Sequence, residues 1–309
     1  MKTEMELIEL QQKIEKIEKL KKSLNAVIVA HNYQRPEVQD IADFYGDSLE
    51  LARICTQVDA EVIVFCGVHF MAESAAILNP ERTVLLSEAD AGCPMADMID
   101  EKDLREWKEG YPKAAVVCYV NSSAAVKALS DICCTSANGL EVVNSLPNDE
   151  IIFIPDQHLG HYISTKTDKR MILYPGFCAP HQRLCPRHIE LAKELHPGGV
   201  VLVHPECSAE VIARADAALS TSQMIRYAKE SDIKTFLIGT EEGILHRMRQ
   251  ENHQKTFHLL TTGLLCPDMK KTTLESVVRT MEQRRNVVKV AEEMRVRAKL
   301  ALDRMLDVT

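Results

Sequence analysis

Three copies of one strand–helix–strand pattern run through most of this chain, and this repeat constrains the fold more than any other feature. The first apolar strand of the successive copies ends at His31, Tyr119 and His204, which are 88 and 85 positions apart. In every copy a hydroxyl residue follows 17 positions later, at or shortly before a helical pattern. These residues are Ser48, Ser136 and Thr221. A repeat of this kind indicates a fold assembled from copies of one unit.

The strands of the repeat are continuous, β-branched apolar runs, which is typical of strands buried on both faces. The runs are residues 26–30, 62–66, 114–120, 151–155, 200–203 and 236–239. Because helical patterns alternate with them, the sequence predicts an α/β fold with parallel sheets. Helices are also expected over residues 3–22 and 272–307, where apolar residues recur every three or four positions.

The repeat also predicts the domain limits. An N-terminal helix within residues 1–24 would precede three similar three-layer αβα domains with short parallel sheets. Those domains would span residues 25–95, 96–180 and 181–270, and residues 271–309 would form C-terminal helices packed on the body. Approximate threefold symmetry would bring the equivalent loops of the three domains to one axis.

Composition is that of an ordinary globular protein. Hydrophobic residues make up 46% of the 309 residues, and the formal charge of −8 argues against a nucleic-acid-binding face. No apolar run approaches the length of a membrane span, and the acidic residues 1–6 are unlike a signal peptide. We therefore expect a cytoplasmic protein that binds neither nucleic acid nor membrane.

Each copy of the repeat carries a cysteine in a loop after its second strand. Cys93 and Cys266 each lie 62 positions after the first strand end of their own copy. The middle copy offers Cys178 at 59 positions and Cys185 at 66, so spacing does not choose between them. Because Pro, Gly or Asp flank the loop cysteines, burial in a core accounts for them poorly.

Ten cysteines in one chain require an explanation. Disulfides rarely persist in the cytoplasm, and free cysteine is usually buried, so most of the ten should be core residues. Three loop thiols at related positions suggest a metal site instead. A zinc site would usually take a fourth ligand, whereas a [4Fe-4S] cluster on three cysteines leaves one iron open to substrate. Buried or incidental cysteines remain the alternative.

Polar residues stand at the carboxyl ends of the predicted strands, where open parallel sheets bind their ligands. They are His31, Tyr33, Tyr119, Asn121, His204 and Glu206. One histidine in such a place is more often structural, but six mixed donors and acceptors favour a substrate pocket. The three hydroxyl residues have two interpretations: ordinary helix caps, or groups that bind carboxylates and phosphate at helix N-termini.

These motifs resemble those of the quinolinate synthase family over residues 26–275. The motifs include His31-Asn32-Tyr33-Gln34, Cys93-Pro94-Met95-Ala96, Gly176-Phe177-Cys178-Ala179-Pro180-His181, His204-Pro205-Glu206-Cys207 and Cys266-Pro267-Asp268-Met269. Some members carry a Cys-x-x-Cys-x-x-Cys run near the last ligand. Only Cys266 stands there in this chain, which therefore resembles the three-cysteine type.

The resemblance implies three α/β domains about a pseudo-threefold axis, with a central active site and a [4Fe-4S] cluster on Cys93, Cys178 and Cys266. It implies a transferase that condenses iminoaspartate with dihydroxyacetone phosphate to quinolinate, with loss of phosphate and water, for NAD biosynthesis. An L-aspartate oxidase would be the partner that supplies the unstable imine.

The resemblance also implies roles for individual residues. Tyr33 and Glu206 are the candidates for proton transfer, and His181 would handle phosphate or protons. The residues expected to bind or orient the substrate are His31, Ser48, Tyr119, Asn121, Ser136, His204, Glu206 and Thr221. Two other classes remain open: a binding or redox-sensing protein with a structural metal, and a hydro-lyase of the aconitase type.

Overall fold

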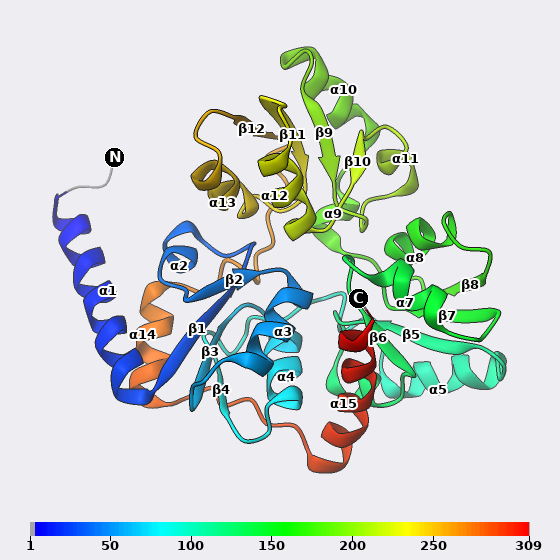
Figure 1. Ribbon diagram of the computed structural model, residues 1–309, viewed down its shortest axis with the longest axis horizontal. Helices are drawn as coiled ribbons and strands as arrows, with labels where there is room; N and C mark the ends of the chain where they lie inside the picture. Colours follow the sequence, from blue (N-terminus) through cyan, green and yellow to red (C-terminus); the bar gives the residue numbers. More distant parts are fainter. Residues whose placement is uncertain (1–3, 309) are drawn as a thin grey trace. The chain divides into compact units, whose positions relative to one another are not determined.

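The computed structural model describes residues 4–308, which form three four-stranded parallel sheets flanked by helices (Figure 1). The strand orders are β2-β1-β3-β4, β6-β5-β7-β8 and β10-β9-β11-β12. In each sheet the chain thus forms an inner strand first and then the strand at one edge. It then crosses back to form the two strands on the other side. The α/β class and the three similar αβα units are confirmed. Residues 1–3 of the expected N-terminal helix and residue 309 lie outside the described part.

The first sheet has helices on both faces. Its strands are β1 (Ala26–His31), β2 (Phe44–Gly46), β3 (Val62–Cys66) and β4 (Thr83–Leu86). Its helices are α1 (Glu4–Leu24), α2 (Pro36–Asp40), α3 (Ser48–Gln57), α4 (His69–Leu78) and α14 (Leu274–Gln283). Ile17 of α1 and Val277 of α14 share one buried cluster with Ile28 and Val64 of the sheet. Full burial of each such side chain contributes roughly 1.5–3 kcal/mol.

The second and third sheets repeat this plan. The second contains β5 (Ala115–Tyr119), β6 (Ile132–Cys134), β7 (Glu150–Ile154) and β8 (Arg170–Leu173), with helices α5 (Glu101–Gly110), α6 (Ala124–Ala128), α7 (Gly139–Ser145), α8 (Gln157–Ser164) and α15 (Glu292–Asp307). The third contains β9 (Val200–Val203), β10 (Ala217–Ala218), β11 (Thr235–Gly239) and β12 (Thr256–Leu259), with helices α10 (Pro186–Leu195), α11 (Ala209–Ile212), α12 (Thr221–Glu230) and α13 (Ile244–Glu251). The short α9 (Ala179–Gln182) precedes α10. Within residues 4–308, no helix combines the length and the apolar character needed to cross a lipid bilayer.

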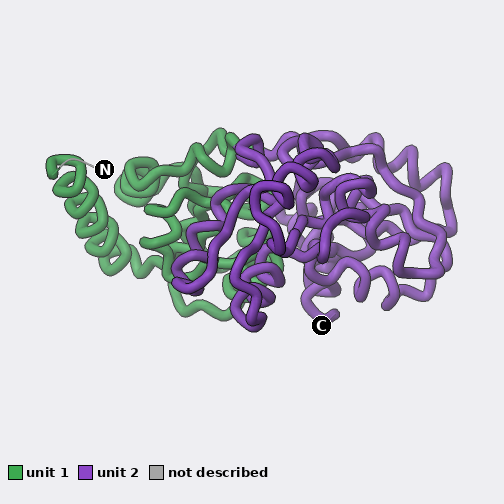
Figure 2. Tube along the Cα trace, turned by 90° about the horizontal axis from the view of Figure 1, so that it is seen from above, with its two compact units in different colours: residues 1–92, 267–290 green, residues 93–266, 291–309 purple. Residues whose placement is uncertain are grey.

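The chain divides into two compact units (Figure 2). Unit 1 comprises Met1–Gly92 and Pro267–Val290 and contains the first sheet. Unit 2 comprises Cys93–Cys266 and Ala291–Thr309 and contains the second and third sheets. All three predicted ligands, Cys93, Cys178 and Cys266, therefore belong to unit 2.

The helix expected over residues 272–307 is interrupted between α14 and α15. Arg284 and Asn286 have φ angles of 45° and 57°, which end α14. The Leu86 N–H then donates to the Asn286 carbonyl at 3.0 Å, and the Val288 N–H donates to the Val84 carbonyl at 2.9 Å. The prediction of helix across this segment is wrong, because the chain there pairs with the exposed edge of β4 instead.

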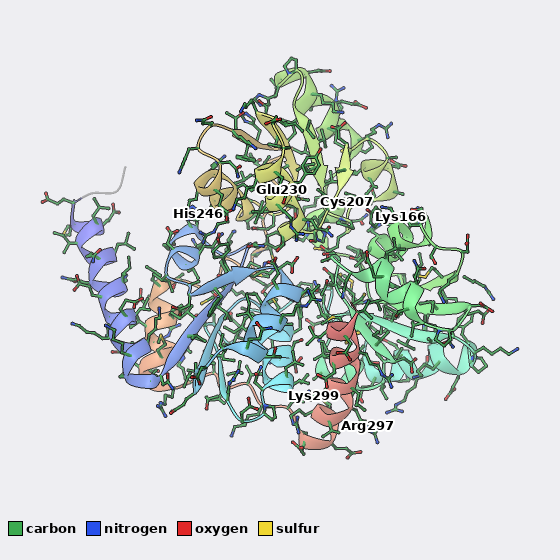
Figure 3. All side chains as sticks on the ribbon, viewed as in Figure 1. Lys166, Cys207, Glu230, His246, Arg297 and Lys299 are labelled. Carbon is green, nitrogen blue, oxygen red and sulfur yellow. The ribbon has the colours of Figure 1, made fainter. Side chains whose placement is uncertain are left out.

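Burial separates the cysteines into distinct groups. Six are buried: Cys55, Cys66, Cys118, Cys133, Cys134 and Cys207, the last of which is labelled in Figure 3. This confirms that most of the ten are core residues. The three predicted ligands are partly exposed, and Cys185 is exposed.

Candidate functional site

The candidate site of unit 2 lies at the carboxyl ends of the inner strands of its sheets. The parallel register pairs Val203 of β9 with Gly239 of β11, and Cys118 of β5 with Ile154 of β7. Residues that follow these pairs therefore share one edge of each sheet. This is the place where the strand order reverses, and ligands of such sheets bind there.

Glu206, three residues after β9, is buried between two imidazoles. Its Oε2 lies 2.8 Å from His181 Nδ1 and 3.3 Å from His204 Nδ1, and the two rings are stacked at 4.8 Å. Burial acts to raise the pKa of Glu206, but His204 and His181 together bring that pKa well below its usual range. The carboxylate is therefore ionised at neutral pH, and its Oε2 can accept a hydrogen bond from either imidazole.

Hydrogen bonds extend this group in both directions. His181 Nε2 lies 2.8 Å from Thr240 Oγ1, and His204 Nε2 lies 3.1 Å from Ser136 Oγ. Thr240, His181, Glu206, His204 and Ser136 thus form one connected chain. Such a chain can hold a proton and pass it between its members. Thr240 was not predicted from the sequence, although it directly follows β11, the second inner strand of its sheet.

Cys93 interacts electrostatically with each of the other two loop thiols. Burial is the main cause that raises the pKa of Cys93 to about 12; Cys266 and Glu206 act in the same direction, and the Ala96 N–H acts against them. Burial also raises the pKa of Cys178 well above its usual range, with Glu206 and Cys93 acting in the same direction. As a thiolate, Cys93 would be repelled by thiolates at Cys178 and Cys266 unless a cation were bound. The donor set therefore fits a metal centre that prefers soft sulfur ligands.

A second set of possible ligands overlaps the first. Cys178, His181 and Glu206 are the one group of three such residues, within the described part of the chain, whose ligand atoms all lie within 4.8 Å of one another. His181 Nδ1 is 3.1 Å from Cys178 Sγ. Glu206 Oε1 is buried and has no hydrogen-bond partner among residues 4–308. These atoms are compatible with a metal cofactor.

The two cysteines of the middle copy have different surroundings. Cys178 stands at the start of α9 and interacts with Cys93, as described above. Cys185 stands at the start of α10, where its exposed thiol lies 3.5 Å from His188 Nδ1. Cys178 is thus the cysteine of the middle copy that interacts electrostatically with Cys93, and its choice as the ligand stays a prediction.

Helix capping does not explain the hydroxyl residues. Asp47 caps α3 because its side chain accepts hydrogen bonds from the N–H groups of residues 49 and 50, and Ser220 caps α12. Ser48 and Thr221 are the first residues of these helices. Ser136 precedes α7, whose N-cap is residue 138, and its hydroxyl contacts His204 as described above. The interpretation of these residues as N-caps is therefore wrong.

Two further candidates of unit 2 follow β5. Tyr119 is the last residue of this strand and is buried. Asn121 Oδ1 is buried without a hydrogen-bond partner in the described part of the protein. An unsatisfied buried oxygen costs about 1–3 kcal/mol, so this atom is suited to accept a hydrogen bond from a ligand.

In unit 1, His31 and Tyr33 form the end of β1. His31 Nδ1 accepts a hydrogen bond from the Tyr33 N–H at 3.1 Å, and the two rings meet edge to face at 4.6 Å. The Tyr33 carbonyl accepts a hydrogen bond from Lys270 Nζ at 2.7 Å. These contacts fix the backbone of both residues while their side chains remain at the carboxyl edge of the first sheet.

Comparisons with known proteins agree with these features. The family model described as Quinolinate synthetase A protein matches residues 15–307. Quinolinate synthase of Dehalococcoides mccartyi is 54% identical over 294 residues, which cover 95% of this chain and 97% of the relative. The enzyme of Thermodesulfovibrio yellowstonii is 52% identical with the same coverage. Quinolinate synthase 1 of Methanosarcina acetivorans is 52% identical over 96% of this chain and 97% of its own length.

Proposed function

Because the chain belongs to the quinolinate synthase family, we propose that it is a transferase that condenses iminoaspartate with dihydroxyacetone phosphate to form quinolinate, phosphate and water. The observation that carries this proposal is the buried group His181–Glu206–His204 at the strand ends, where Cys178 Sγ lies 3.1 Å from His181 Nδ1. Condensation, dehydration and ring closure all require proton transfers, for which this group is suited.

The cofactor in this proposal is a [4Fe-4S] cluster held by Cys93, Cys178 and Cys266. The mutual electrostatic interaction of these thiols supports it. When bound, a cluster with three thiolate ligands supplies an iron that can act as a Lewis acid toward a substrate oxygen. The alternative is a single metal ion on Cys178, His181 and Glu206, because the ligand atoms of these residues all lie within 4.8 Å of one another.

The polar side chains would bind the two carboxylates and the phosphate of the substrates. In unit 2, Ser136 offers a hydroxyl, and Thr221 offers one at the N-terminus of the ten-residue α12, where backbone N–H groups favour anions. Asn121 Oδ1 would accept a hydrogen bond from the substrate nitrogen. The family resemblance assigns the same kind of contact to Tyr119, His204, His31 and Ser48.

Proton transfer would centre on Glu206. Since this carboxylate is ionised, it would hold a protonated His181 or His204 rather than donate a proton itself. The hydrogen bond between Thr240 Oγ1 and His181 Nε2 would keep Nδ1, the other ring nitrogen of His181, directed at Glu206. Tyr33 is the second proposed proton-transfer residue.

We also propose that the enzyme works in the cytoplasm, where an L-aspartate oxidase would supply the imine. The proposed ligands must be thiolates, and a reducing compartment keeps thiols available. An experiment for the partner is to compare quinolinate formation with free imine and with the imine generated by the oxidase in the same vessel.

The central experiment is anaerobic reconstitution with iron and sulfide, followed by an assay for quinolinate. We expect about four irons and four sulfides per chain, as the cluster type requires, and product only when both substrates are present. Cys178→Ser should lose the cluster, whereas Cys185→Ser should keep iron, sulfide and activity. Zinc without sulfide would contradict the cluster and favour the single-ion site. Dehydration of one substrate without use of dihydroxyacetone phosphate would favour a hydro-lyase.

A further inference from the structure

A buried carboxylate stands two residues after the second inner strand in two of the three copies. β7 ends at Ile154 and is followed by Asp156, while β11 ends at Gly239 and is followed by Glu241. Both side chains are completely buried, with 0% exposure. The first copy has Val68 at the corresponding position.

Glu241 joins two backbone segments. Its Oε1 accepts a hydrogen bond from the Cys266 N–H at 3.2 Å, and its Oε2 accepts one from the Gly243 N–H at 2.7 Å. Gly243 is the N-cap of α13, so one carboxylate connects the start of this helix to a proposed cluster ligand. Each oxygen faces a donor, and hydrogen bonds from N–H groups to an ionised carboxylate are among the stronger ones in proteins.

Asp156 has a related environment in the middle copy. Its Oδ1 accepts hydrogen bonds from the N–H groups of His158 and Leu159, both at 2.8 Å, and so caps α8. The ligand loop runs beside it, because the Gln157 N–H donates to the Gly176 carbonyl at 2.9 Å. Burial and Glu206 raise the pKa of Asp156 well above its usual range, although the N–H groups of His158 and Leu159 act to lower it. Its Oδ2 has no hydrogen-bond partner among residues 4–308.

We propose that Glu241 is a positioning residue that fixes the loop cysteine Cys266 against the adjacent strand end, whereas Asp156 caps α8 and lies beside the Cys178 loop only through the Gln157 backbone. The proposal rests on the proposed function in so far as Cys266 binds the cluster. The loops are irregular backbone, and a carboxylate held at a strand end supplies the acceptor that a sheet neighbour would otherwise provide. Groups that orient metal ligands in this way commonly control metal affinity and potential.

Three consequences can be measured for Glu241. If the carboxylate holds Cys266 in place, its loss should speed the release of iron from the cluster. Because it also brings negative charge near the cluster, its neutralisation should raise the reduction potential. In the metal-free protein, the Cys266 thiol should become more accessible while Cys93 stays unchanged.

The test compares Glu241→Gln with Glu242→Gln. Glutamine keeps the shape but turns one acceptor into an NH₂ group, which then faces the N–H of either Cys266 or Gly243. The adjacent Glu242 is partly exposed and gives a control with the same loss of charge. Iron release from the anaerobic holoenzyme to a chelator, and alkylation of Cys266 in the metal-free protein, are followed for both variants.

We expect both rates to rise severalfold in Glu241→Gln and to match the parent enzyme in Glu242→Gln. Equal rates in Glu241→Gln and the parent would overturn the inference. A parent protein that binds no cluster would contradict the proposed function, and the alkylation rates would still test the positioning role. If Glu241→Gln does not fold, Glu241→Asp, which keeps the charge but shortens the side chain, is measured at Cys266 in the same way, and an unchanged alkylation rate there likewise overturns the inference.

Discussion

Glu206 is a buried carboxylate whose two partners are imidazoles, and this limits the proton transfers in which it can take part. With its pKa well below the usual range, it stays ionised at neutral pH and has no proton to donate. The side chains that exchange protons with substrate are therefore best sought in His181 and His204, with Glu206 as the fixed charge between them.

Glu206→Gln should abolish turnover, with a loss of at least about 10²-fold, while iron and sulfide contents stay unchanged. Glutamine retains the size of the side chain but removes the charge that stabilises a protonated His181 or His204. Quinolinate formation and metal content are measured on the same preparation, with the exposed Glu210→Gln as the control. Near-normal activity would exclude Glu206 from acid–base chemistry, and loss of the cluster would assign it a structural role.

Tyr33→Phe should also abolish turnover without loss of iron. Phenylalanine preserves the edge-to-face contact with His31 and the carbonyl that Lys270 contacts, so only the hydroxyl is removed. Tyr45→Phe, a more exposed position in the same unit, is the matched control. The measurement is quinolinate formation at saturating substrates, and retained activity would remove Tyr33 from the proton-transfer residues.

The Cys118 thiol should make the free energy of unfolding depend on pH. Burial acts to raise the pKa of this thiol, but Cys133 and the buried Lys127 bring it down to about 7, below its ordinary value. The folded state thus holds fewer protons than the unfolded state between the two values, so this group adds stability above the unfolded pKa and loses it as the pH falls through 7. Between pH 7 and 8.5, urea unfolding of the metal-free protein should show a gain of about 1–2 kcal/mol relative to Cys118→Ser. An equal pH dependence in both proteins would contradict the ionised thiol.

Sequence reasoning found residues whose position alone marks them. His204 and Glu206 stand out because they follow a continuous apolar strand. Glu241 and Thr240 were missed, since their importance depends on how residues 178–181 and 266 fold back onto the strand end, which no local pattern records. Position in the repeat was the available signal, because the same offset also selects Asp156.

At the scale of elements, the inner strands were predicted closely and the outer strands were not. The runs at residues 62–66 and 200–203 match β3 and β9. The edge strands β2 and β10 have three residues and two residues, too few for a hydrophobic period to appear. The segment near Val287 has a helical pattern in its sequence, but its backbone pairs with β4. Tertiary pairing determines such segments more than their own composition does.

The loop that carries Cys178 should be sensitive to the glycine two residues before it. A Cβ at Gly176 would lie 2.5 Å from the Pro155 carbonyl oxygen, so Gly176→Ala must displace the backbone of the loop. We expect reduced iron binding in an otherwise folded protein, measured by iron content and circular dichroism. Gly92→Ala is the control, because a Cβ there meets no atom within 4 Å although Cys93 is the next residue. Equal iron contents in the two variants would show that the loop adapts.

At the scale of the whole molecule, the chain passes twice through each unit. Residues 267–290 return to unit 1 with α14, and residues 291–309 return to unit 2, where α15 packs on α6 and β6. The sequence predicted helices at this end, but it did not indicate that they belong to different units. The domain limits at residues 95, 180 and 270, and the threefold arrangement about a central active site, stay predictions.

The last prediction concerns the loaded enzyme with its product. Six of the ten cysteines are buried and Cys185 is exposed beside His188, which leaves three thiols for four irons within the described chain. One iron should therefore be free of protein thiolate and open to a carboxylate or hydroxyl of the ligand. Adding quinolinate to the anaerobic holoenzyme should change the electronic and magnetic spectra of the cluster, while a monocarboxylic pyridine of similar size should have a weaker effect. Spectra that stay unchanged at saturating quinolinate would rule out direct binding and leave the cluster a structural role.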